Sequence, residues 1–191
     1  MPKIICIGRN YLEHIKELNN LVPEQTVIFC KPMSSAADTL ISQFNGEACH
    51  YETELCFKIS DGEITQAGLG LDLTLRQTQA SLKSKGLPWE RAKAFNGSAL
   101  FTDFVEISSL SDFSFTLTVD NVVKQQGHSH MMMLTPSQIV SEIKTFMTLE
   151  DGDIIMTGTP AGVGEVEIGK QYTVELKQHD KPLLRHSWIS Q

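Results

Sequence analysis

Two glutamates and one aspartate have the spacing that points most directly to metal chemistry. Glu52 and Glu54 lie in a run over residues 51–59 that predicts a β-strand. Successive side chains of a strand point to opposite faces, so the two carboxylates share a face, with their Cα atoms about 7 Å apart. Asp72 falls in a second predicted strand, over residues 68–73, which is too apolar to hold an unpaired charge. Three carboxylates of this kind favour Mg²⁺ or Mn²⁺ over zinc.

These acidic residues also have a simpler interpretation. Glu52 and Glu54 can form the solvated outer face of an amphipathic strand, and Asp72 can be a turn residue at a strand end. Their spacing alone leaves both interpretations open.

Basic and amide side chains follow the aspartate closely. Arg76 comes four residues after Asp72, and Gln79 follows about one helical turn later. Lys93 sits in a mostly small and apolar stretch, where a buried ammonium would need an anion as its partner. The alternative for Lys93 is an ordinary surface lysine. We therefore expect these three residues beside the carboxylates if the site is real.

Histidines occur in two patterns that could do chemistry. His14 and Glu17 are three residues apart in a short predicted helix, so they share a face and can act together as a general base. The alternative is an incidental surface pair. His128 and His130 would share a strand face and could bind zinc, but no third ligand is near in the sequence. We expect that pair in a solvated loop or strand.

A glycine-rich segment over residues 151–164 predicts a strand that runs into a loop carrying Thr157 and Thr159. Exposed backbone amides in such a loop can bind a carboxylate or a phosphate. The segment lacks the Gly-Lys-Ser/Thr ending of a P-loop. A plain tight turn remains the alternative to an anion-binding loop.

The elements that must position these residues are mostly strands. Short apolar runs separated by Gly, Pro, Asn and Asp predict strands over residues 4–7, 27–31, 51–59, 68–73, 113–119, 153–157 and 172–177. Fewer helices are predicted: a short one after Asn10, one over residues 76–85 that ends at Gly86, and one that starts at Thr135-Pro136 and runs through Met147. Many strands without regular strand–helix alternation favour an α+β fold.

Composition limits the class of protein. The 191 residues have a formal net charge of −7, with 41% apolar and 20% charged residues, which is typical of one folded domain spanning residues 1–191. The acidic balance argues against nucleic acid as a partner. The first 95 residues carry 10 basic and 11 acidic side chains, so cationic partners for an anionic ligand should come from that half.

The sequence also indicates the cellular location of the protein. No run approaches the roughly 20 apolar residues of a membrane span. The apolar run near the N-terminus is too short for a signal peptide. The four cysteines have neither redox nor zinc spacing, so we expect buried free thiols and a cytoplasmic protein with no membrane partner.

Taken together, five segments resemble the fumarylacetoacetate hydrolase family, in the short form related to the acylpyruvases. In order, they are GRNYLEHIKE (8–17), ETE (52–54), GLDLTLR (70–76), GLPWERAK (86–93) and TGTPAGVG (157–164). The resemblance covers nearly the whole chain. It implies a mixed β-sandwich or β-roll with a few short helices, usually as a homodimer.

The resemblance also implies a role for each candidate residue. It implies a Mg²⁺ or Mn²⁺ site formed by Glu52, Glu54 and Asp72. Lys93 would lie beside the metal as a catalytic residue, and Arg76, Gln79 and Thr159 would bind substrate. The water-activating pair would be His14 and Glu17, on a helix that orders over bound ligand.

The first expectation for activity is the hydrolysis of acylpyruvates, small anionic 2-oxo acids, to pyruvate and a carboxylic acid. A divalent cation would polarise the 2-oxo acid end, and positive side chains would stabilise the developing enolate. The same site could instead decarboxylate or tautomerise oxaloacetate, or isomerise 2-hydroxyhepta-2,4-diene-1,7-dioate. A remote alternative of another class is a non-catalytic protein that binds a metal or an oxo acid.

Overall fold

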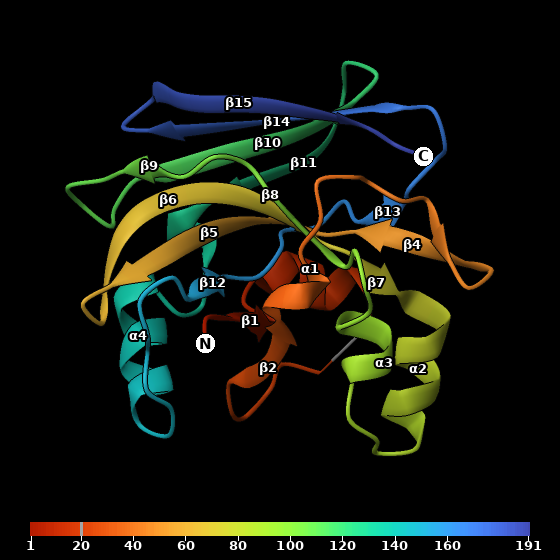
Figure 1. The fold of residues 1–191 in the computed structure, drawn as a ribbon, viewed down its shortest axis with the longest axis horizontal. Coiled ribbons are helices and arrows are strands. Elements are labelled where there is room, and N and C mark those ends of the chain that lie inside the picture. The colour runs from red at the N-terminus through yellow and green to blue at the C-terminus, as the bar shows by residue number, and fades with distance from the viewer. Residues whose placement is uncertain (20) are drawn as a thin grey trace.

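Figure 1 shows the computed structural model of the protein, which describes residues 1–19 and 21–191. Its strands form three sheets. The largest has seven strands, in the order β2 (Val27–Pro32), β1 (Lys3–Gly8), β12 (Ile154–Met156), β5 (Thr53–Ser60), β6 (Glu63–Asp72) and β8 (Ala99–Phe101), with β9 (Val105–Glu106) paired to β6. Its strand pairs are antiparallel except β1 with β12, which is parallel.

Two smaller sheets complete the strand framework. One is an antiparallel meander in the order β11 (Val122–His128), β10 (Phe113–Val119), β14 (Gln171–Gln178) and β15 (Lys181–Ile189). The other combines short strands around β4: β13 (Gly164–Glu165), β4 (Glu47–Tyr51), β3 (Gln43–Phe44) and β7 (Thr74–Leu75).

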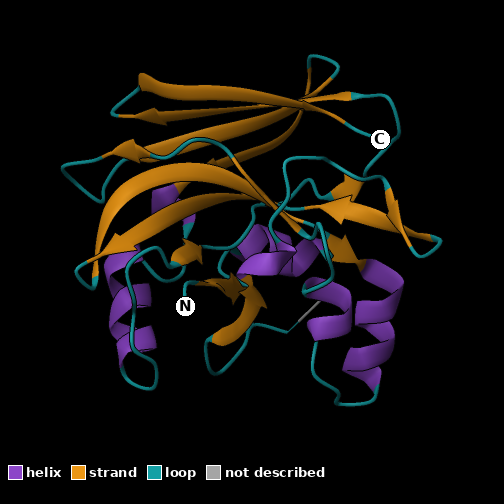
Figure 2. Ribbon diagram, viewed as in Figure 1, coloured by secondary structure: helices purple, strands orange, loops and turns teal. Residues whose placement is uncertain are grey.

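Helices lie on one side of this framework. Figure 2 shows them on the side of β5 and β6 that faces away from the β10–β11–β14–β15 sheet. The helices are α1 (Leu12–Glu17), α2 (Arg76–Ser84), α3 (Glu90–Lys93) and α4 (Pro136–Lys144), with 3₁₀ turns at Met33–Ser35 and Ser129–Met131. The layers are therefore sheet, sheet and helix.

The main core lies between the seven-stranded sheet and the β10–β11–β14–β15 sheet. Phe57 of β5 packs edge-on against Phe113 of β10, with ring centroids 5.6 Å apart. Tyr51 of β4 packs in the same way against Tyr172 of β14, also at 5.6 Å. These aromatic pairs bury apolar surface from strands that are far apart in the sequence, so they hold the layers together. The α+β class and the mixed-sheet architecture are confirmed.

One predicted strand is interrupted at a functional residue. The prediction of a single strand over residues 51–59 was wrong, because β4 ends at Tyr51, β5 begins at Thr53, and Glu52 lies between them. The backbone nitrogen of Asp72 donates to the Glu52 carbonyl at 2.8 Å, so this break is tied to the end of β6. The β-strand alternation alone therefore does not set the direction of the Glu52 side chain.

Glycine allows β5, β6 and β8 to approach closely beside the site. A Cβ on Gly70 of β6 would lie 2.9 Å from both the Cys56 sulfur and the Leu100 carbonyl oxygen. Gly70 pairs with Glu54 across the β5–β6 ladder. The missing side chain thus brings the backbone of β6 against its neighbours directly opposite a candidate metal ligand.

The helix predictions were mostly confirmed. Thr135 and Gln138 form a reciprocal capping box at the start of α4, with Pro136 in the first turn. The predicted extension through Met147 was wrong, since α4 ends at Lys144 and Phe146 beyond it is exposed. The strands β11 and β15 were not predicted, because their many polar residues hide the strand pattern.

The cysteines and the helices bear on the expected thiol state and on the expected lack of a membrane span. All four cysteines are free thiols, and Cys6, Cys49 and Cys56 are buried, whereas Cys30 is partly buried. In the described part of the chain, no helix is both long and apolar enough to cross a membrane.

Candidate functional site

The three acidic candidates meet at one place in the structure. Glu52 lies between β4 and β5, Glu54 is in β5, and Asp72 ends β6. Each offers a carboxylate oxygen, and these oxygens lie within 4.8 Å of one another. All three side chains are buried, with relative exposures of 5%, 2% and 1%. The interpretation of the two glutamates as a solvated strand face is therefore wrong.

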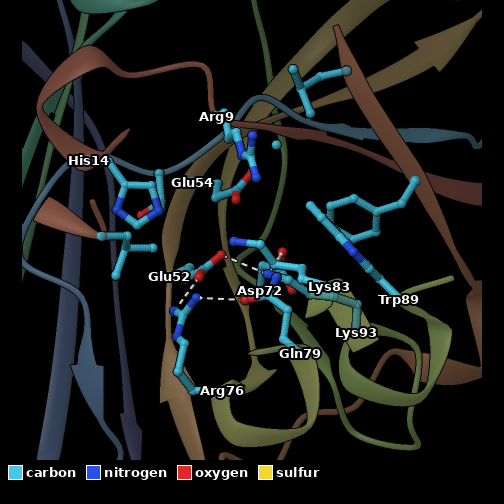
Figure 3. Close-up of a pocket in the computed structure, with 15 residues that line it drawn as sticks. Arg9, His14, Glu52, Glu54, Asp72, Arg76, Gln79, Lys83, Trp89 and Lys93 are labelled. Carbon is cyan, nitrogen blue, oxygen red and sulfur yellow. Dashed lines mark hydrogen bonds and ion pairs between the residues drawn. The ribbon is translucent and has the colours of Figure 1, made fainter. Parts of the chain in front are cut away.

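Lys93 lies directly against this cluster (Figure 3). Its ammonium donates to Glu52 Oε2 and Asp72 Oδ2, both at 2.7 Å, and to the Thr74 hydroxyl at 2.6 Å. The side chain is buried, so the interpretation as a surface lysine is also wrong. α3 places it there, because Lys93 is the last residue of that helix. Its backbone nitrogen donates a hydrogen bond to the Trp89 carbonyl.

Arg76 and Gln79 approach the cluster from α2. Arg76 Nη2 donates to Glu52 Oε1 at 2.5 Å, and Nη1 donates to Gln79 Oε1 at 3.0 Å. The two residues are three apart on a helix that starts at Arg76, so they share one helical face. The sequence spacing thus predicted this arrangement correctly.

A second buried lysine was missed at the sequence level. Lys31 in β2 is fully buried, and its Nζ lies 2.8 Å from Asp72 Oδ1. It also donates to the carbonyl oxygens of Ser98, at 2.8 Å, and Lys93. Nothing in its local sequence marks it, since it sits near the end of a predicted strand 41 residues before its acidic partner.

Burial and charge perturb the pKa values of the cluster in opposite directions. Burial opposes ionisation of Glu52, but Lys93 and Arg76 outweigh it and hold the pKa of Glu52 far below its usual range. Within the described residues Glu54 forms no ion pair with a lysine or arginine, so burial and the charges of Asp72 and Glu52 raise its pKa well above its usual value. Asp72 and Glu52 overcome the burial of Lys93 and raise the pKa of its ammonium. Without a bound metal, the anions around Lys93 thus favour its charged form.

The donor set fits a hard divalent cation. Ligand oxygens of an octahedral Mg²⁺ or Mn²⁺ ion lie about 3 to 4.2 Å apart, close to the spacing of the three carboxylates. Asp72 Oδ1 accepts no hydrogen bond within the described residues, although the Lys31 ammonium lies 2.8 Å from it as an ion-pair partner. A buried carboxylate oxygen with this spare capacity is what a metal ligand requires.

His14 and Glu17 form the predicted pair. His14 Nδ1 lies 3.1 Å from Glu17 Oε2, and the His14 side chain lines the same pocket as the three carboxylates. The other Glu17 oxygen accepts a hydrogen bond from the Gly162 nitrogen at 2.9 Å. Glu17 therefore orients the imidazole and also attaches α1 to the loop over residues 157–164.

Thr159 lines the pocket, but its hydroxyl is already used within the protein. It donates to the Thr53 carbonyl at 2.9 Å and accepts from Gln125 Nε2 at 2.8 Å. Gln125 belongs to β11 and was not predicted. The adjacent Gly158 nitrogen donates to Glu54 Oε2 at 2.7 Å, so the loop contacts the acidic cluster through its backbone. The interpretation of this loop as a plain tight turn therefore leaves out its contact with the acidic cluster.

The pocket at this cluster is partly open to solvent, and about 450 Å³ of space lies between its lining atoms and the solvent above them. Two further cationic side chains on its wall were missed at the sequence level, Arg9 and Lys83. Lys83 could have been found, since it continues the helical face of Arg76 and Gln79. By contrast, the 3₁₀ turn near His128 and His130 lies outside this pocket, and His130 is exposed.

Comparisons with known proteins agree with this description. The family model for the fumarylacetoacetate hydrolase C-terminal domain matches residues 3–186. The chain is 34% identical to an oxaloacetate tautomerase of Escherichia coli (strain K12), over 94% of this chain and 90% of that protein.

Solved structures share the fold. A protein of Oleispira antarctica assigned to the fumarylacetoacetate isomerase/hydrolases is similar with a TM-score of 0.93 and 37% identity, over 100% of this chain and 94% of the other. The fumarylpyruvate hydrolase of Pseudomonas aeruginosa, crystallised with Mn²⁺ and pyruvate, has a TM-score of 0.87 and 26% identity, over 100% and 89%.

Proposed function

Since the chain belongs to the fumarylacetoacetate hydrolase family, we propose that it is a divalent-metal-dependent tautomerase that interconverts the keto and enol forms of oxaloacetate. One observation carries the proposal: the His14–Glu17 pair lines the same pocket as the Glu52, Glu54 and Asp72 cluster. Similarity to an oxaloacetate tautomerase along most of the chain supports this choice of substrate.

Residues of the acidic cluster would hold the cation. Mg²⁺ or Mn²⁺ bound by the three carboxylates would act as a Lewis acid toward the 2-oxo acid end of the substrate. Lys93 and Arg76 already contact this cluster, so they add fixed positive charge where the C2 oxygen becomes negative during enolisation.

Enolisation moves one proton. It leaves C3, the C2–C3 bond becomes double, and the C2 oxygen finally carries the proton. With Glu17 ionised and accepting from His14 Nδ1–H, the lone pair of the imidazole is at Nε2, which can take the proton from C3. The protonated imidazole then transfers that proton to the C2 oxygen, and the two transfers run in the opposite order when the keto form is made from the enol. Tautomerisation therefore needs only groups that the pocket contains.

Hydrolysis of acylpyruvates, the first expectation from the sequence, is the second candidate. The observation that favours it is again the His14–Glu17 pair, because a carboxylate-oriented imidazole can remove a proton from an attacking water. The similarity to a fumarylpyruvate hydrolase supports this alternative. Decarboxylation of oxaloacetate would need the same cation and no attacking water.

Substrate and product assays separate the three reactions. Enol-oxaloacetate is followed by its ultraviolet absorbance, with Mg²⁺ or Mn²⁺ alone as the control, and pyruvate is measured in parallel. A tautomerase accelerates the approach to keto–enol equilibrium without forming pyruvate. Pyruvate from oxaloacetate would indicate a decarboxylase, and pyruvate from acetylpyruvate would indicate a hydrolase. If the protein adds nothing to the rate with metal alone, the proposal is wrong.

The homodimer and the cytoplasmic location implied by the sequence remain predictions. Light scattering after size-exclusion chromatography would measure the oligomeric state directly.

A further inference from the structure

A buried amide side chain stands at an irregular point of β11. Gln125 is only 1% exposed, although the residue before it, Lys124, is exposed. Leu117 of β10 pairs with Gln125. The next residue of β10, Thr118, pairs with Val123, which leaves Lys124 as the extra residue of a β-bulge. Bulges redirect side chains and are common beside active sites, so the environment of Gln125 is informative.

The Gln125 amide uses both of its ends. Its Oε1 accepts from the Thr53 backbone nitrogen at 3.0 Å. Its Nε2 donates to the Thr159 hydroxyl at 2.8 Å and to the Pro160 carbonyl at 2.9 Å. A backbone nitrogen only donates and a carbonyl only accepts, so these partners fix the orientation of the amide. One side chain of the β10–β11–β14–β15 sheet thus connects β5 with the loop over residues 157–164.

The backbone of the bulge contacts the same loop. A Cβ on Gly162 would lie 2.0 Å from the Lys124 carbonyl oxygen and 3.3 Å from Gln125 Cγ. Gly162 also has a φ of 101°, which residues with a side chain rarely adopt. Glycine therefore lets the loop pack directly against the bulge. β11 holds the loop in two ways, through the Gln125 side chain and through the Lys124 carbonyl.

The loop binds two carboxylates of the site through its backbone. The Gly158 nitrogen donates to Glu54 at 2.7 Å, and the Gly162 nitrogen donates to Glu17 at 2.9 Å. The two loop residues that Gln125 contacts lie between these glycines. Glu54 is also held by the β5–β6 ladder, whereas Glu17 is on the six-residue helix α1 and its side chain is 30% exposed. The position of Glu17 therefore depends more strongly on the loop.

We propose that Gln125 is a positioning residue: it fixes the loop over residues 157–164, and the Gly162 nitrogen of that loop sets the direction of the Glu17 carboxylate that orients His14. Gln125 lies outside the pocket lining, so it acts through Glu17 and not on the substrate. Misplacement of a catalytic group by about 1 Å can cost about a hundredfold in rate. The inference rests on the proposed function, because the imidazole is the base in that proposal.

Kinetics of Gln125→Met test the inference, because methionine has a similar length and makes none of the three hydrogen bonds. In the Mn²⁺-loaded protein, kcat for oxaloacetate should fall about 10- to 100-fold. KM should stay within about threefold, since Arg76 and Lys93 are unchanged. In a Glu17→Ala background, Gln125→Met should change kcat by less than about twofold, because its effect passes through Glu17. A full further loss in that background overturns the inference.

Two other variants frame this result. Gln126→Met is the matched control, because the side chain of Gln126 is exposed on the opposite face of β11, and it should keep the wild-type kcat. Gly162→Ala displaces the loop from the bulge and should reproduce the kcat loss, so the test does not depend on the folding of one variant. A wild-type kcat in both Gln125→Met and Gly162→Ala overturns the inference.

Hydrogen exchange of the metal-free protein gives a readout that needs no activity. In Gln125→Met, amide exchange should become at least about tenfold faster in peptides that cover α1 and the loop over residues 157–164. Exchange in β14, which belongs to the same sheet as β11, should stay within about threefold of the wild type. An equal increase in β14 would indicate general destabilisation and would overturn the inference.

The outcomes separate the two proposals. If the wild type does not tautomerise oxaloacetate, but exchange in Gln125→Met rises only in α1 and the loop, positioning by Gln125 is supported and the proposed function is wrong. If the wild type tautomerises oxaloacetate, and Gln125→Met changes neither kcat nor exchange in these segments, the proposed function is supported and the inference is wrong.

Discussion

Lys31 Nζ lies 2.8 Å from Asp72 Oδ1, and both side chains are almost completely shielded from solvent. The two residues come from β2 and β6, which are not adjacent in the sheet. The same ammonium donates to the carbonyl oxygens of Lys93 and Ser98. One lysine thus connects a candidate metal ligand to the end of the helix that carries Lys93.

Replacing Lys31 with methionine should destabilise the protein by about 3 to 5 kcal/mol, because it leaves Asp72 short of a buried partner. Urea unfolding measures the change. The control is Lys144→Met, which removes a surface pair with Glu63 and should cost less than about 1 kcal/mol. Equal unfolding midpoints for Lys31→Met and the wild type would contradict the structural role of Lys31.

Glu54→Gln should weaken Mn²⁺ binding by more than about a hundredfold, since it removes a charged ligand and not merely an outer partner. Glu54 is the best position for this test, because its side chain accepts a hydrogen bond from the Gly158 backbone nitrogen. The amide oxygen of a glutamine can accept the same hydrogen bond. Asp72→Asn would instead leave Lys31 without its anionic partner and Lys93 with Glu52 alone. Calorimetry with Mn²⁺ measures the affinity, and Asp103→Asn, at an exposed residue, is the control.

In the wild type, saturating Mn²⁺ should also raise the melting temperature, because the ion binds the folded chain preferentially. This rise should be absent in Glu54→Gln. If Glu54→Gln keeps the wild-type affinity and the same thermal shift, Glu54 is not a metal ligand.

Glu17→Gln should lower the kcat for oxaloacetate tautomerisation by about 10²- to 10⁴-fold with little change in Mn²⁺ affinity. An amide facing His14 Nδ1 can donate to it, which would place the ring proton on Nε2 and remove the base. Stopped-flow absorbance gives kcat. Glu13→Gln, an exposed change on the same helix, should behave as the wild type.

Hydrolysis and decarboxylation can be compared in a Glu17→Ala variant. Hydrolysis of acetylpyruvate should lose more activity than any decarboxylation of oxaloacetate, because only hydrolysis needs an activated water. Equal losses in the two reactions would argue against water activation by Glu17.

Acid should remove a stabilising contribution from Asp153. Burial opposes its ionisation, but hydrogen bonds from the nitrogens of Glu150 and Lys3 and from the Lys3 ammonium lower its pKa. Because the folded-state pKa lies below the unfolded value of about 3.9, the contribution is complete above that pH and is lost as pH falls through the folded pKa. Asp153→Asn should therefore cost about 1 to 3 kcal/mol at pH 7.

The measurement is urea unfolding of the wild type and Asp153→Asn between pH 7 and pH 2.5. Their stabilities should converge only in the acidic part of this range. A difference that does not change with pH would mean that charge on Asp153 is not the source of the effect.

Local spacing was enough to predict several parts of the site. His14 with Glu17, and Arg76 with Gln79, are three residues apart on helices, so their contacts depend only on helical geometry. Asp72 was identified because its strand is too apolar for an unpaired charge. All the cationic side chains on the pocket wall also come from the first 95 residues, as the charge distribution predicted.

The amino-acid sequence by itself therefore determined which residue types were available and which near neighbours would meet. Only the tertiary structure decided that Lys31 pairs with Asp72, that Arg9 lies on the pocket wall and that Gln125 occupies the Thr159 hydroxyl. It also decided the break at Glu52. The physical reason is that a buried charge or hydroxyl takes its partner from whichever strand packs against it, and local spacing contains no information about that strand.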